Sequence, residues 1–257
     1  MRGGLRRWPW LGVGVLMLGT ACLDAPAQTG RRVAKSTLVI GVDVSGSFRQ
    51  HYDDAISFAA HYLYGHLHGM GELRVPTAVF VGSVGGGEPG EAKSFQPVHL
   101  FEGKNVAEIE ATLRDLYPPQ DSYTDFNSFF DRVATLVKRQ GLVLAPINMI
   151  LLSDGVPDVT NRREGGGDDD RFERIDLSPL EYLSRNVTVR LLYADPTTSV
   201  EWERRIKRNR VRMWTVDAPV MAGWRDQLVT GAVEEQQDGL WRWVRDNVDF
   251  RVRSRRL

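Results

Sequence analysis

The chain has 257 residues, of which 33 are Lys or Arg and 33 are Asp or Glu, and it contains a single cysteine. This neutral balance argues against nucleic acid as the main partner, because nucleic-acid binding generally calls for a strongly basic face. A lone cysteine rules out an intramolecular disulfide. The length suits one α/β domain with a sizeable core.

The N-terminus has the pattern of an export signal with a lipid attachment site. Residues 1–7 are basic, and the apolar stretch 8–19 is too short to span a membrane comfortably. Cys22 follows Leu18-Gly19-Thr20-Ala21, which resembles the lipobox of bacterial lipoproteins, although Gly19 stands where that motif usually has leucine. The resemblance implies a lipid on Cys22, so that the protein is anchored to a membrane and does not span it.

We therefore divide the chain into a signal peptide (1–21), a tether (22–35), a folded domain (36–250) and a basic tail (251–257). Removing 1–21 leaves 30 basic against 33 acidic residues. The alternative is an ordinary signal peptide, which would leave Cys22 as a free thiol in an oxidising compartment. We favour the lipoprotein interpretation, which places the domain in the bacterial cell envelope, where the tail could also contact anionic lipid headgroups.

The first predicted strand delivers polar side chains to the edge of a sheet. The apolar run Leu38-Val39-Ile40-Gly41-Val42 reads as a buried strand and is followed by Asp43-Val44-Ser45-Gly46-Ser47. Open α/β folds bind ligands at the carboxyl ends of their strands, so Asp43, Ser45 and Ser47 are candidates for a cation site. A helix cap or a turn is the competing interpretation, since both commonly use Asp and Ser.

Strands and helices alternate along the rest of the chain, which predicts a mainly parallel sheet. Apolar residues spaced by three and four indicate helices, and short apolar runs indicate strands. The expected helices cover 48–70, 106–116, 126–137, 199–208, 221–228 and 233–248, and the further expected strands cover 78–81, 98–101, 147–152, 187–193 and 211–216.

Two later segments add oxygen ligands to the candidate site. Thr124 lies in a polar loop at or just before the helix that starts at Phe126, and the strand 147–152 ends in Ser153-Asp154-Gly155. Mg²⁺ takes near-octahedral oxygen ligands at about 2.1 Å and usually keeps several waters, so three hydroxyls and two carboxylates suit it. Gly46 and Gly155 fit positions where the backbone turns tightly or approaches an ion.

The three segments in this order resemble the metal-ion-dependent adhesion site of von Willebrand factor type A (VWA) domains. The resemblance implies a single Rossmann-like α/β domain with a mainly parallel central sheet and helices on both faces. It also implies one antiparallel edge strand, formed by a hairpin of 78–81 and 98–101.

The resemblance further implies what each site residue does. Ser45, Ser47 and Thr124 would offer hydroxyl oxygens to Mg²⁺, or alternatively to Mn²⁺ or Ca²⁺, while Asp43 and Asp154 would hold its waters or bind it directly. Ser122 is close enough in sequence to replace Thr124. Such a site leaves a position open for an Asp or Glu carboxylate of another protein, so the expected function is metal-dependent binding of a protein ligand, without catalysis.

Two other functional classes compete with this interpretation. Haloacid dehalogenase-type phosphatases also place an Asp after their first strand, but they need a second acid two residues later, where this chain has Ser45. A serine hydrolase lacks support because no G-x-S-x-G occurs. A third possibility, a structural lipoprotein whose site no longer binds metal, is left open by the sequence.

Three further features receive less weight. The glycine-rich segment 85–90 is read as a hairpin loop and not as a phosphate loop, since Glu88 and Glu91 would repel phosphate. His61, His66 and His68 are expected to face solvent at a helix end, without forming a zinc site. The charged loop 161–171 is expected to overhang the metal site and to help select the partner.

Overall fold

The computed structural model describes residues 36–249, except for 89–90, 92–93, 121–122 and 159–169. These residues belong to one compact unit, Ala34–Leu257. The predicted lipidation site Cys22, the alternative hydroxyl of Ser122 and residues 161–169 of the charged loop lie outside the described residues, as do the predicted signal peptide, tether and tail. The domain boundaries at both ends therefore stay predictions.

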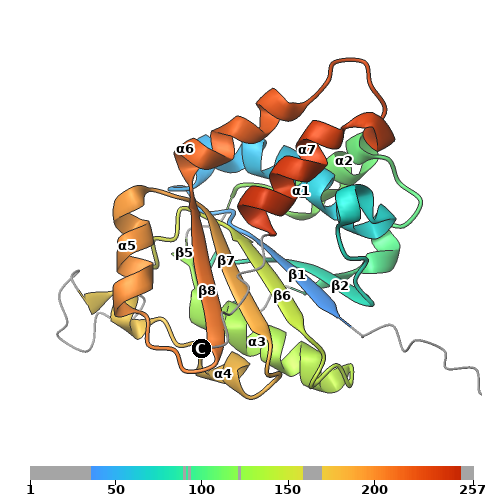
Figure 1. The fold of residues 1–257 in the computed structure, drawn as a ribbon. Helices are drawn as coiled ribbons and strands as arrows, with labels where there is room; N and C mark the ends of the chain where they lie inside the picture. The colour runs from blue at the N-terminus through green and yellow to red at the C-terminus, as the bar shows by residue number, and fades with distance from the viewer. Residues whose placement is uncertain (1–35, 89–90, 92–93, 121–122, 159–169, 250–257) are drawn as a thin grey trace, which may run out of the picture. The chain divides into compact units, whose positions relative to one another are not determined.

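A six-stranded sheet forms the centre of the fold (Figure 1), in the order β4-β2-β1-β6-β7-β8. Every neighbouring pair is parallel except β2 and β4, which are antiparallel. A separate two-stranded sheet joins β3 to β5. The strands are β1 (Thr37–Val42), β2 (Ala78–Ser83), β3 (Gly85–Gly86), β4 (Gln96–Pro97), β5 (Tyr123–Thr124), β6 (Ile147–Leu152), β7 (Val187–Ala194) and β8 (Val211–Asp217).

Helices cover both faces of the sheet. On one face lie α1 (Arg49–His68), α2 (Val106–Leu116), α6 (Ala218–Met221) and α7 (Asp238–Trp243), and on the other lie α3 (Phe126–Arg139), α4 (Ser178–Glu181) and α5 (Pro196–Arg205). A π-helical turn, Val244–Val248, follows α7, and short 3-10 helices span Met70–Glu72, Val98–Leu100, Phe172–Arg174, Ala222–Gln227 and Glu234–Gln236. Within the described residues, no helix is both long and apolar enough to cross a bilayer.

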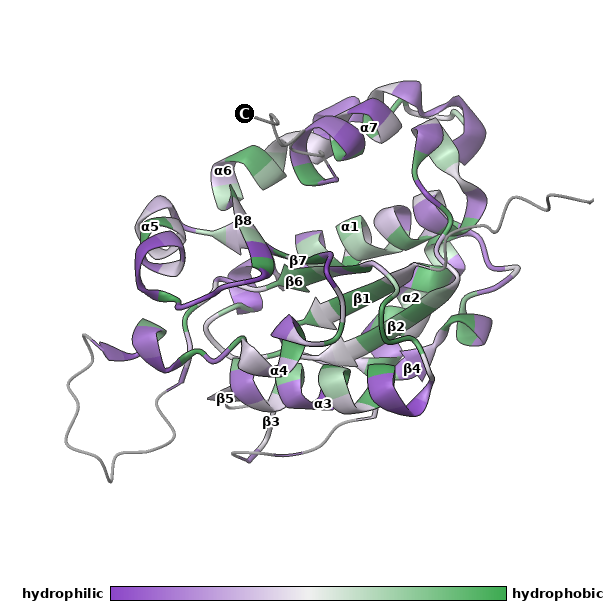
Figure 2. Ribbon diagram, turned by 60° about the horizontal axis from the view of Figure 1, so that its bottom comes forward, coloured by the Kyte–Doolittle hydropathy of each residue, from purple (hydrophilic) through white to green (hydrophobic). Residues whose placement is uncertain are grey.

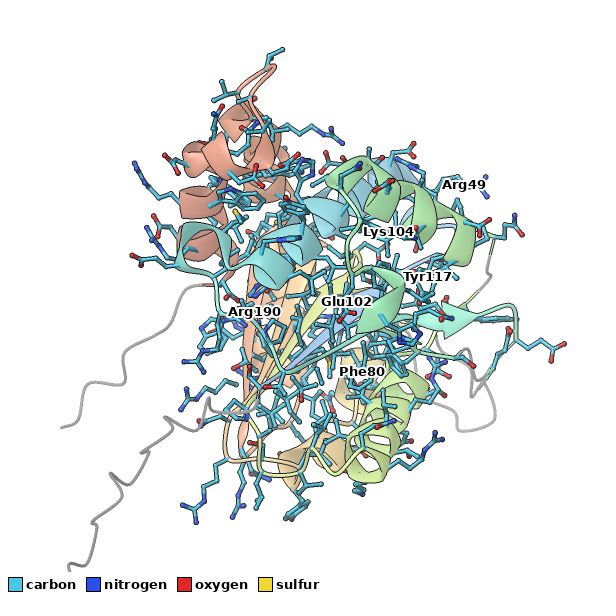
Figure 3. The ribbon with its side chains drawn as sticks, turned by 90° about the vertical axis from the view of Figure 1, so that its right-hand side faces the viewer. Arg49, Phe80, Glu102, Lys104, Tyr117 and Arg190 are labelled. Atoms are coloured by element: carbon cyan, nitrogen blue, oxygen red, sulfur yellow. The ribbon has the colours of Figure 1, made fainter. Side chains whose placement is uncertain are left out.

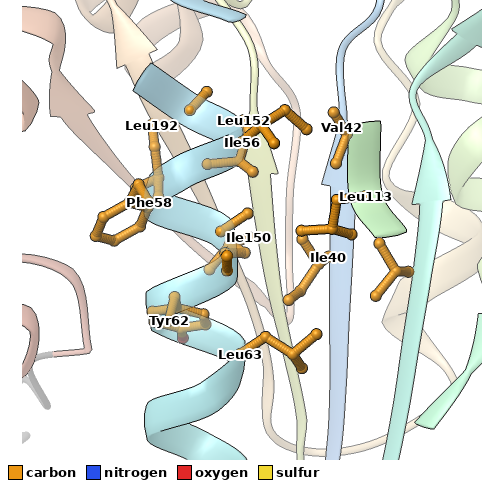
Figure 4. Packing of buried hydrophobic residues seen from close by; sticks show 14 of the residues in the cluster. Ile40, Val42, Ile56, Phe58, Tyr62, Leu63, Leu113, Ile150, Leu152 and Leu192 are labelled. Atoms are coloured by element: carbon orange, nitrogen blue, oxygen red, sulfur yellow. The ribbon is translucent and has the colours of Figure 1, made fainter. Parts of the chain in front are cut away.

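The alternation of side chains along the strands creates two apolar cores, one on each face. In β1, Leu38, Ile40 and Val42 belong to the core shared with α1, whereas Val39 belongs to the core shared with α3. Figure 4 shows Leu152 of β6 beside Ile56 of α1, and Ile40 and Ile150 of adjacent strands next to each other. Figure 2 shows the strands as the apolar interior between helices of mixed hydropathy. This is the double-sided burial that a parallel sheet requires.

The fold class predicted from the sequence is confirmed: the domain is a VWA-like, Rossmann-like α/β fold with one antiparallel edge strand. Counted along the main sheet alone, its strands run 3-2-1-4-5-6, the doubly wound order. The chain reverses its direction of winding between β1 and β6, which are hydrogen-bonded neighbours. In such folds, ligands bind in the crevice outside the carboxyl ends of the strands at that point.

Some predicted elements were wrong in position or type. The predicted strand at 98–101 is a 3-10 helix, and the edge strand that pairs with β2 is Gln96–Pro97. Pro97 has no N–H to donate to a ladder, which explains why the pairing stops there. Helix α5 begins at Pro196, earlier than predicted, because the Asp195 carboxylate accepts hydrogen bonds from the Thr197 and Thr198 amides and caps it.

The prediction of solvent-facing histidines was wrong for two of the three residues. His68 is exposed, but His61 and His66 are buried. The Nδ1–H of His61 donates to the Ser57 carbonyl at 2.9 Å, and that of His66 donates to the Arg74 carbonyl at 2.9 Å. The causes are tertiary. Trp224 packs against His61, with ring centroids 5.2 Å apart, whereas His66 lies among the first residues of the strands, with its Nε2 3.7 Å from Asp249.

Candidate functional site

Asp43 forms the centre of the candidate site. It follows β1 directly, and its side chain is almost fully buried, with 1% of the residue exposed. Its amide donates to the Leu152 carbonyl at 2.9 Å, which continues the pairing of β1 with β6 past the end of the strand. Its Oδ1 accepts from the Ser45 amide at 2.9 Å, and its Oδ2 accepts from the Ser153 hydroxyl at 2.6 Å. The carboxylate is thus fixed between the ends of the two central strands.

The three predicted hydroxyl ligands gather around this carboxylate. The Ser45 and Ser47 hydroxyl oxygens are 3.2 Å apart, and the Thr124 hydroxyl lies 3.4 and 3.3 Å from the two carboxylate oxygens of Asp43. Neighbouring ligands of an octahedral ion with bonds of about 2.1 Å are separated by about 3.0 Å. The Ser45–Ser47 spacing is therefore close to what a shared Mg²⁺ requires. Ser45 is buried and Ser47 is exposed, so the site reaches the surface.

Thr124 owes its position to contacts that are distant in sequence. It pairs with Gly85 in the β3–β5 ladder, where a side chain at position 85 would lie 1.9 Å from the Tyr123 carbonyl oxygen. Its amide donates to the Asp158 carboxylate at 2.5 Å, and its carbonyl accepts from the Asp158 amide at 3.1 Å. Asp125 then caps α3 by accepting from the Ser128 amide at 2.9 Å. Thr124 accordingly lies just before a helix, as the sequence suggested.

Asp154 lies beyond the end of β6, next to the same crevice. It is half-buried, and its Oδ1 accepts from the Val156 amide at 3.0 Å, which closes a turn. The next residue, Gly155, has φ +78°, and a Cβ there would lie 2.5 Å from Leu191 Cδ2. The expectation of a tight turn at Gly155 is borne out. At Gly46, φ is not in the left-handed region and a Cβ would meet no atom within 4 Å, so the structure gives no steric reason for that glycine.

Sequence reasoning missed two residues that support the site. The Ser153 hydroxyl donates to Asp43 and accepts from the Gly155 amide at 3.0 Å, so it links the two strand ends. Asp158 fixes the backbone of Thr124 by hydrogen bonds to both its amide and its carbonyl. The signal for Ser153 was its place between the strand and Asp154. Nothing local to Asp158 indicates a partner 34 residues earlier.

The electrostatics of the site favour a cation. Burial raises the pKa of Asp43 from its ordinary 3.8 to about 6; hydrogen bonds from Ser153 and Ser45 lower it and the charge of Asp154 raises it. Two carboxylates beside three hydroxyls form an all-oxygen donor set of the kind that Mg²⁺, Mn²⁺ and Ca²⁺ prefer. In the described part of the chain, no group of three or more His, Cys, Asp or Glu side chains is placed to hold a metal. A cation here would therefore depend on the hydroxyls.

The geometry of two loop motifs bears on their alternative interpretations. The N-cap of α1 is Phe48 and makes no side-chain capping bond, so neither Asp43 nor the two serines cap that helix. Asp43 does close a turn onto the Ser45 amide, which agrees with the turn interpretation without excluding a metal. In the glycine-rich segment, the Glu91 carboxylate accepts from the Gly87 amide at 2.6 Å, so a carboxylate already occupies an amide that a phosphate loop would use.

No family model and no curated protein sequence matches this chain. Solved structures that are similar include the SpRpn10 VWA domain, with a TM-score of 0.43 and 9% identity over 80% of this chain and 94% of that one. The manganese-loaded TRAP protein of Plasmodium vivax has a TM-score of 0.42 and 16% identity over 72% and 70%. Proximal thread matrix protein 1 of the mussel byssus has a TM-score of 0.42 and 12% identity over 75% and 46%, so the chain spans less than half of that protein. At these scores the similarities carry no argument about function. The assignment of a VWA-like fold rests on the strand order of this chain and on the polar site where the winding reverses, between β1 and β6.

Proposed function

We propose that the domain binds a protein ligand through a divalent cation held in the crevice between the ends of β1 and β6. The observation that carries the proposal is the convergence of Asp43, Ser45, Ser47 and Thr124, with Asp154 beside them, at the topological switch point. Mg²⁺ is the preferred ion, and Mn²⁺ and Ca²⁺ fit the same all-oxygen donor set.

Each residue has a separate part in this function. The hydroxyls of Ser45, Ser47 and Thr124 would bind the ion directly, and Asp43 and Asp154 would hold its waters or join it. Neutral hydroxyls quench little of the charge of a divalent ion, so the metal stays attractive to an outside carboxylate. Because Ser47 is exposed, that carboxylate can arrive from solvent as an Asp or Glu of the partner.

Two alternatives have less support. A phosphatase of the haloacid dehalogenase type needs an acid two residues after its nucleophile, and Ser45 stands there with its amide bonded to Asp43. A structural lipoprotein with a site that binds no metal has the same fold as a working domain, so metal binding separates the two. The membrane anchor through Cys22, and with it a place in the bacterial cell envelope, is proposed from the sequence alone.

Thermal unfolding of the full chain tests the metal site. Wild type, Asp43→Ala and the exposed matched control Asp226→Ala are unfolded in EDTA and then with Mg²⁺, Mn²⁺ or Ca²⁺. Binding to the folded state at a hundred times Kd stabilises it by about 2.7 kcal/mol, which for a domain of this size is a rise in Tm of about 5–10 °C. The rise is expected in wild type and control and not in Asp43→Ala. Equal rises in all three proteins, or none, would contradict the proposal.

The carboxylate-binding step needs a separate measurement. Mn²⁺ bound to the full chain can be followed by electron paramagnetic resonance while acetate is added as a probe of the open position. We expect the spectrum to change with acetate in wild type. A spectrum that does not respond to acetate, in protein that has been shown to bind Mn²⁺, would argue against recognition of a partner's carboxylate.

The anchor is tested by labelling cells that express the full chain with an alkyne-bearing fatty acid. Wild type is expected to take up the label and to sediment with membranes, and Cys22→Ser is expected to lose the label. If Cys22→Ser keeps the label, then Cys22 is not the attachment site.

A further inference from the structure

A polar cavity lies at the edge of the sheet opposite to the cation site. Its volume is about 300 Å³, and it is lined by residues at the beginnings of β1, β6, β7 and β8 and at the end of α1. The six residues of β1 separate it from Asp43 by about 20 Å. It is therefore a separate site, and its occupant would have no part in the proposed cation binding.

Polar side chains occupy positions here that the strand pattern would otherwise give to the apolar core. Asn148 of β6 and Arg190 of β7 point to the α1 face, because their neighbours in each strand belong to the opposite core. Arg190 is buried, with 5% of the residue exposed, and Figure 3 labels it. A buried charge costs stability unless it is paired and hydrogen-bonded, and Arg190 donates to Asn148 Oδ1 and lies 3.9 Å from the Asp249 carboxylate.

Three buried polar atoms in the cavity wall lack a hydrogen-bond partner among the described residues: Ser36 Oγ, Thr37 Oγ1 and His66 Nε2. The residues are 9%, 1% and 3% exposed. Burial lowers the pKa of His66 and keeps the ring neutral. Because Nδ1–H donates to the Arg74 carbonyl, Nε2 is then an acceptor. Buried polar groups in native proteins nearly always find partners, so this wall calls for an occupant with both donors and acceptors.

The charges of the cavity favour an anion. Three arginines line it, Arg74, Arg190 and Arg212, against the single carboxylate of Asp249. That carboxylate is already engaged: its Oδ1 accepts from Tyr62 at 3.1 Å and from Asn148 at 3.0 Å, and Arg190 lies 3.9 Å away. Its Oδ2 is 3.7 Å from His66 Nε2, which is beyond hydrogen-bond distance. Arg74 and Arg212 are exposed at the mouth.

Two exposed apolar side chains adjoin lining residues of this mouth in the chain. Val75 lies between the lining residues Arg74 and Pro76, and Leu144 is two residues before the lining residue Pro146. Leu144 is 80% exposed and Val75 is 53% exposed. Leu144 is the most exposed large apolar residue that the structure describes. Apolar and aromatic side chains beside arginines are typical of surfaces that contact a membrane interface.

We propose that this cavity binds a phosphate group that carries a hydroxylated substituent, the chemistry of a glycerophosphate. The phosphate oxygens accept from Arg74, Arg212 and the hydroxyls of Ser36 and Thr37, and a hydroxyl of the ligand donates to His66 Nε2. The ligand is either a soluble glycerophosphate or the headgroup of an anionic glycerophospholipid. The apolar rim favours the lipid, in which case the cation site at the far edge of the sheet points away from the bilayer.

Titration of the full chain with glycerol 3-phosphate, followed by calorimetry, tests the cavity. We expect binding to wild type that weakens at least fivefold in Thr37→Val and in Arg212→Gln. Ser47→Ala, at the opposite edge, should bind as wild type does. Inorganic phosphate should bind more weakly than glycerol 3-phosphate, because it lacks the hydroxylated substituent that donates to His66 Nε2.

Nanodiscs distinguish the two sources of the ligand. The full chain is compared on discs of phosphatidylglycerol and of phosphatidylcholine, so that any contribution of residues 1–35 is common to all variants. A preference for phosphatidylglycerol that is reduced in Arg212→Gln and in Leu144→Ser identifies a lipid headgroup. Binding of glycerol 3-phosphate without such a preference identifies a soluble ligand. Binding of neither, or binding that Thr37→Val and Arg212→Gln leave unchanged, overturns the proposal.

Discussion

Replacing Asp43 by asparagine removes a buried negative charge while keeping the shape of the side chain. In the metal-free protein, burial is the main reason why the pKa of this carboxyl stands at about 6 and not at 3.8. A folded-state pKa above the unfolded one means that the folded protein binds the proton more tightly. The resulting stability is complete below the unfolded value and is lost as the pH rises through about 6.

The size of this effect follows from the two pKa values. The whole difference corresponds to about 3 kcal/mol, most of which falls between pH 4 and pH 8. Asparagine does not titrate, so position 43 adds no pH dependence to the unfolding free energy of the Asp43→Asn variant. It does lose one contact, because an amide NH₂ in place of Oδ2 cannot accept the Ser153 proton, at a cost of about 1 kcal/mol that does not depend on pH.

Urea unfolding in EDTA, followed by tryptophan fluorescence from pH 4 to pH 8, measures this difference. We expect the stability of wild type relative to Asp43→Asn to fall by about 2–3 kcal/mol across the range, so that the variant is the more stable protein at pH 8. Asp226→Asn, at an exposed aspartate, is the matched control and should follow wild type. Parallel profiles for wild type and Asp43→Asn would refute the reasoning that burial raises the pKa of Asp43.

Three further substitutions test a turn, a helix cap and a buried hydrogen bond, and urea midpoints measure the effect of each. Gly155→Ala should destabilise the domain by about 3 kcal/mol, since it places a Cβ at φ +78° and 2.5 Å from Leu191; a loss below about 1 kcal/mol would mean that the turn relaxes easily. Asn105→Ala removes the capping box of α2 and should cost about 1 kcal/mol, whereas the neighbouring exposed Glu102→Ala should cost almost nothing. Tyr62→Phe removes a donor to the Asp249 carboxylate and should cost about 2 kcal/mol; an unchanged midpoint would show that this contact adds no net stability.

Local sequence patterns were sufficient for most of the fold. The apolar spacing of 106–116 predicted α2 with both ends correct, and the runs at 147–152 and 211–216 correspond to β6 and β8. Short apolar runs were less informative. The run at 98–101 has the composition of a strand, yet Pro97 ends the pairing with β2 and the chain continues as a 3-10 helix.

Contacts with the C-terminal segment decided what the sequence of α1 left open. Apolar spacing alone predicted a helix with one buried stripe. In the structure Trp224 packs against His61, whereas the strand beginnings and Asp249 enclose His66, so both histidines are buried. The sequence of the helix gives no sign of these contacts with the C-terminal segment, because the contacting residues lie more than 150 positions later.

The two sites differ in how far the sequence alone could locate them. Asp43, Ser45 and Ser47 lie within five residues after a strand, and the rule that ligands bind at the carboxyl ends of parallel strands was enough to select them. Placing the Thr124 hydroxyl against Asp43, across 81 residues, required the Gly85 pairing and the Asp158 contact. The cavity at the other edge was not predicted at all, since it joins residues from β1, α1, β6, β7, β8 and the C-terminal segment, none of which forms a local motif. Strand and helix patterns are set by neighbours in the chain, whereas a site built from separate elements exists only once the sheet order and the packing of the helices bring those elements together.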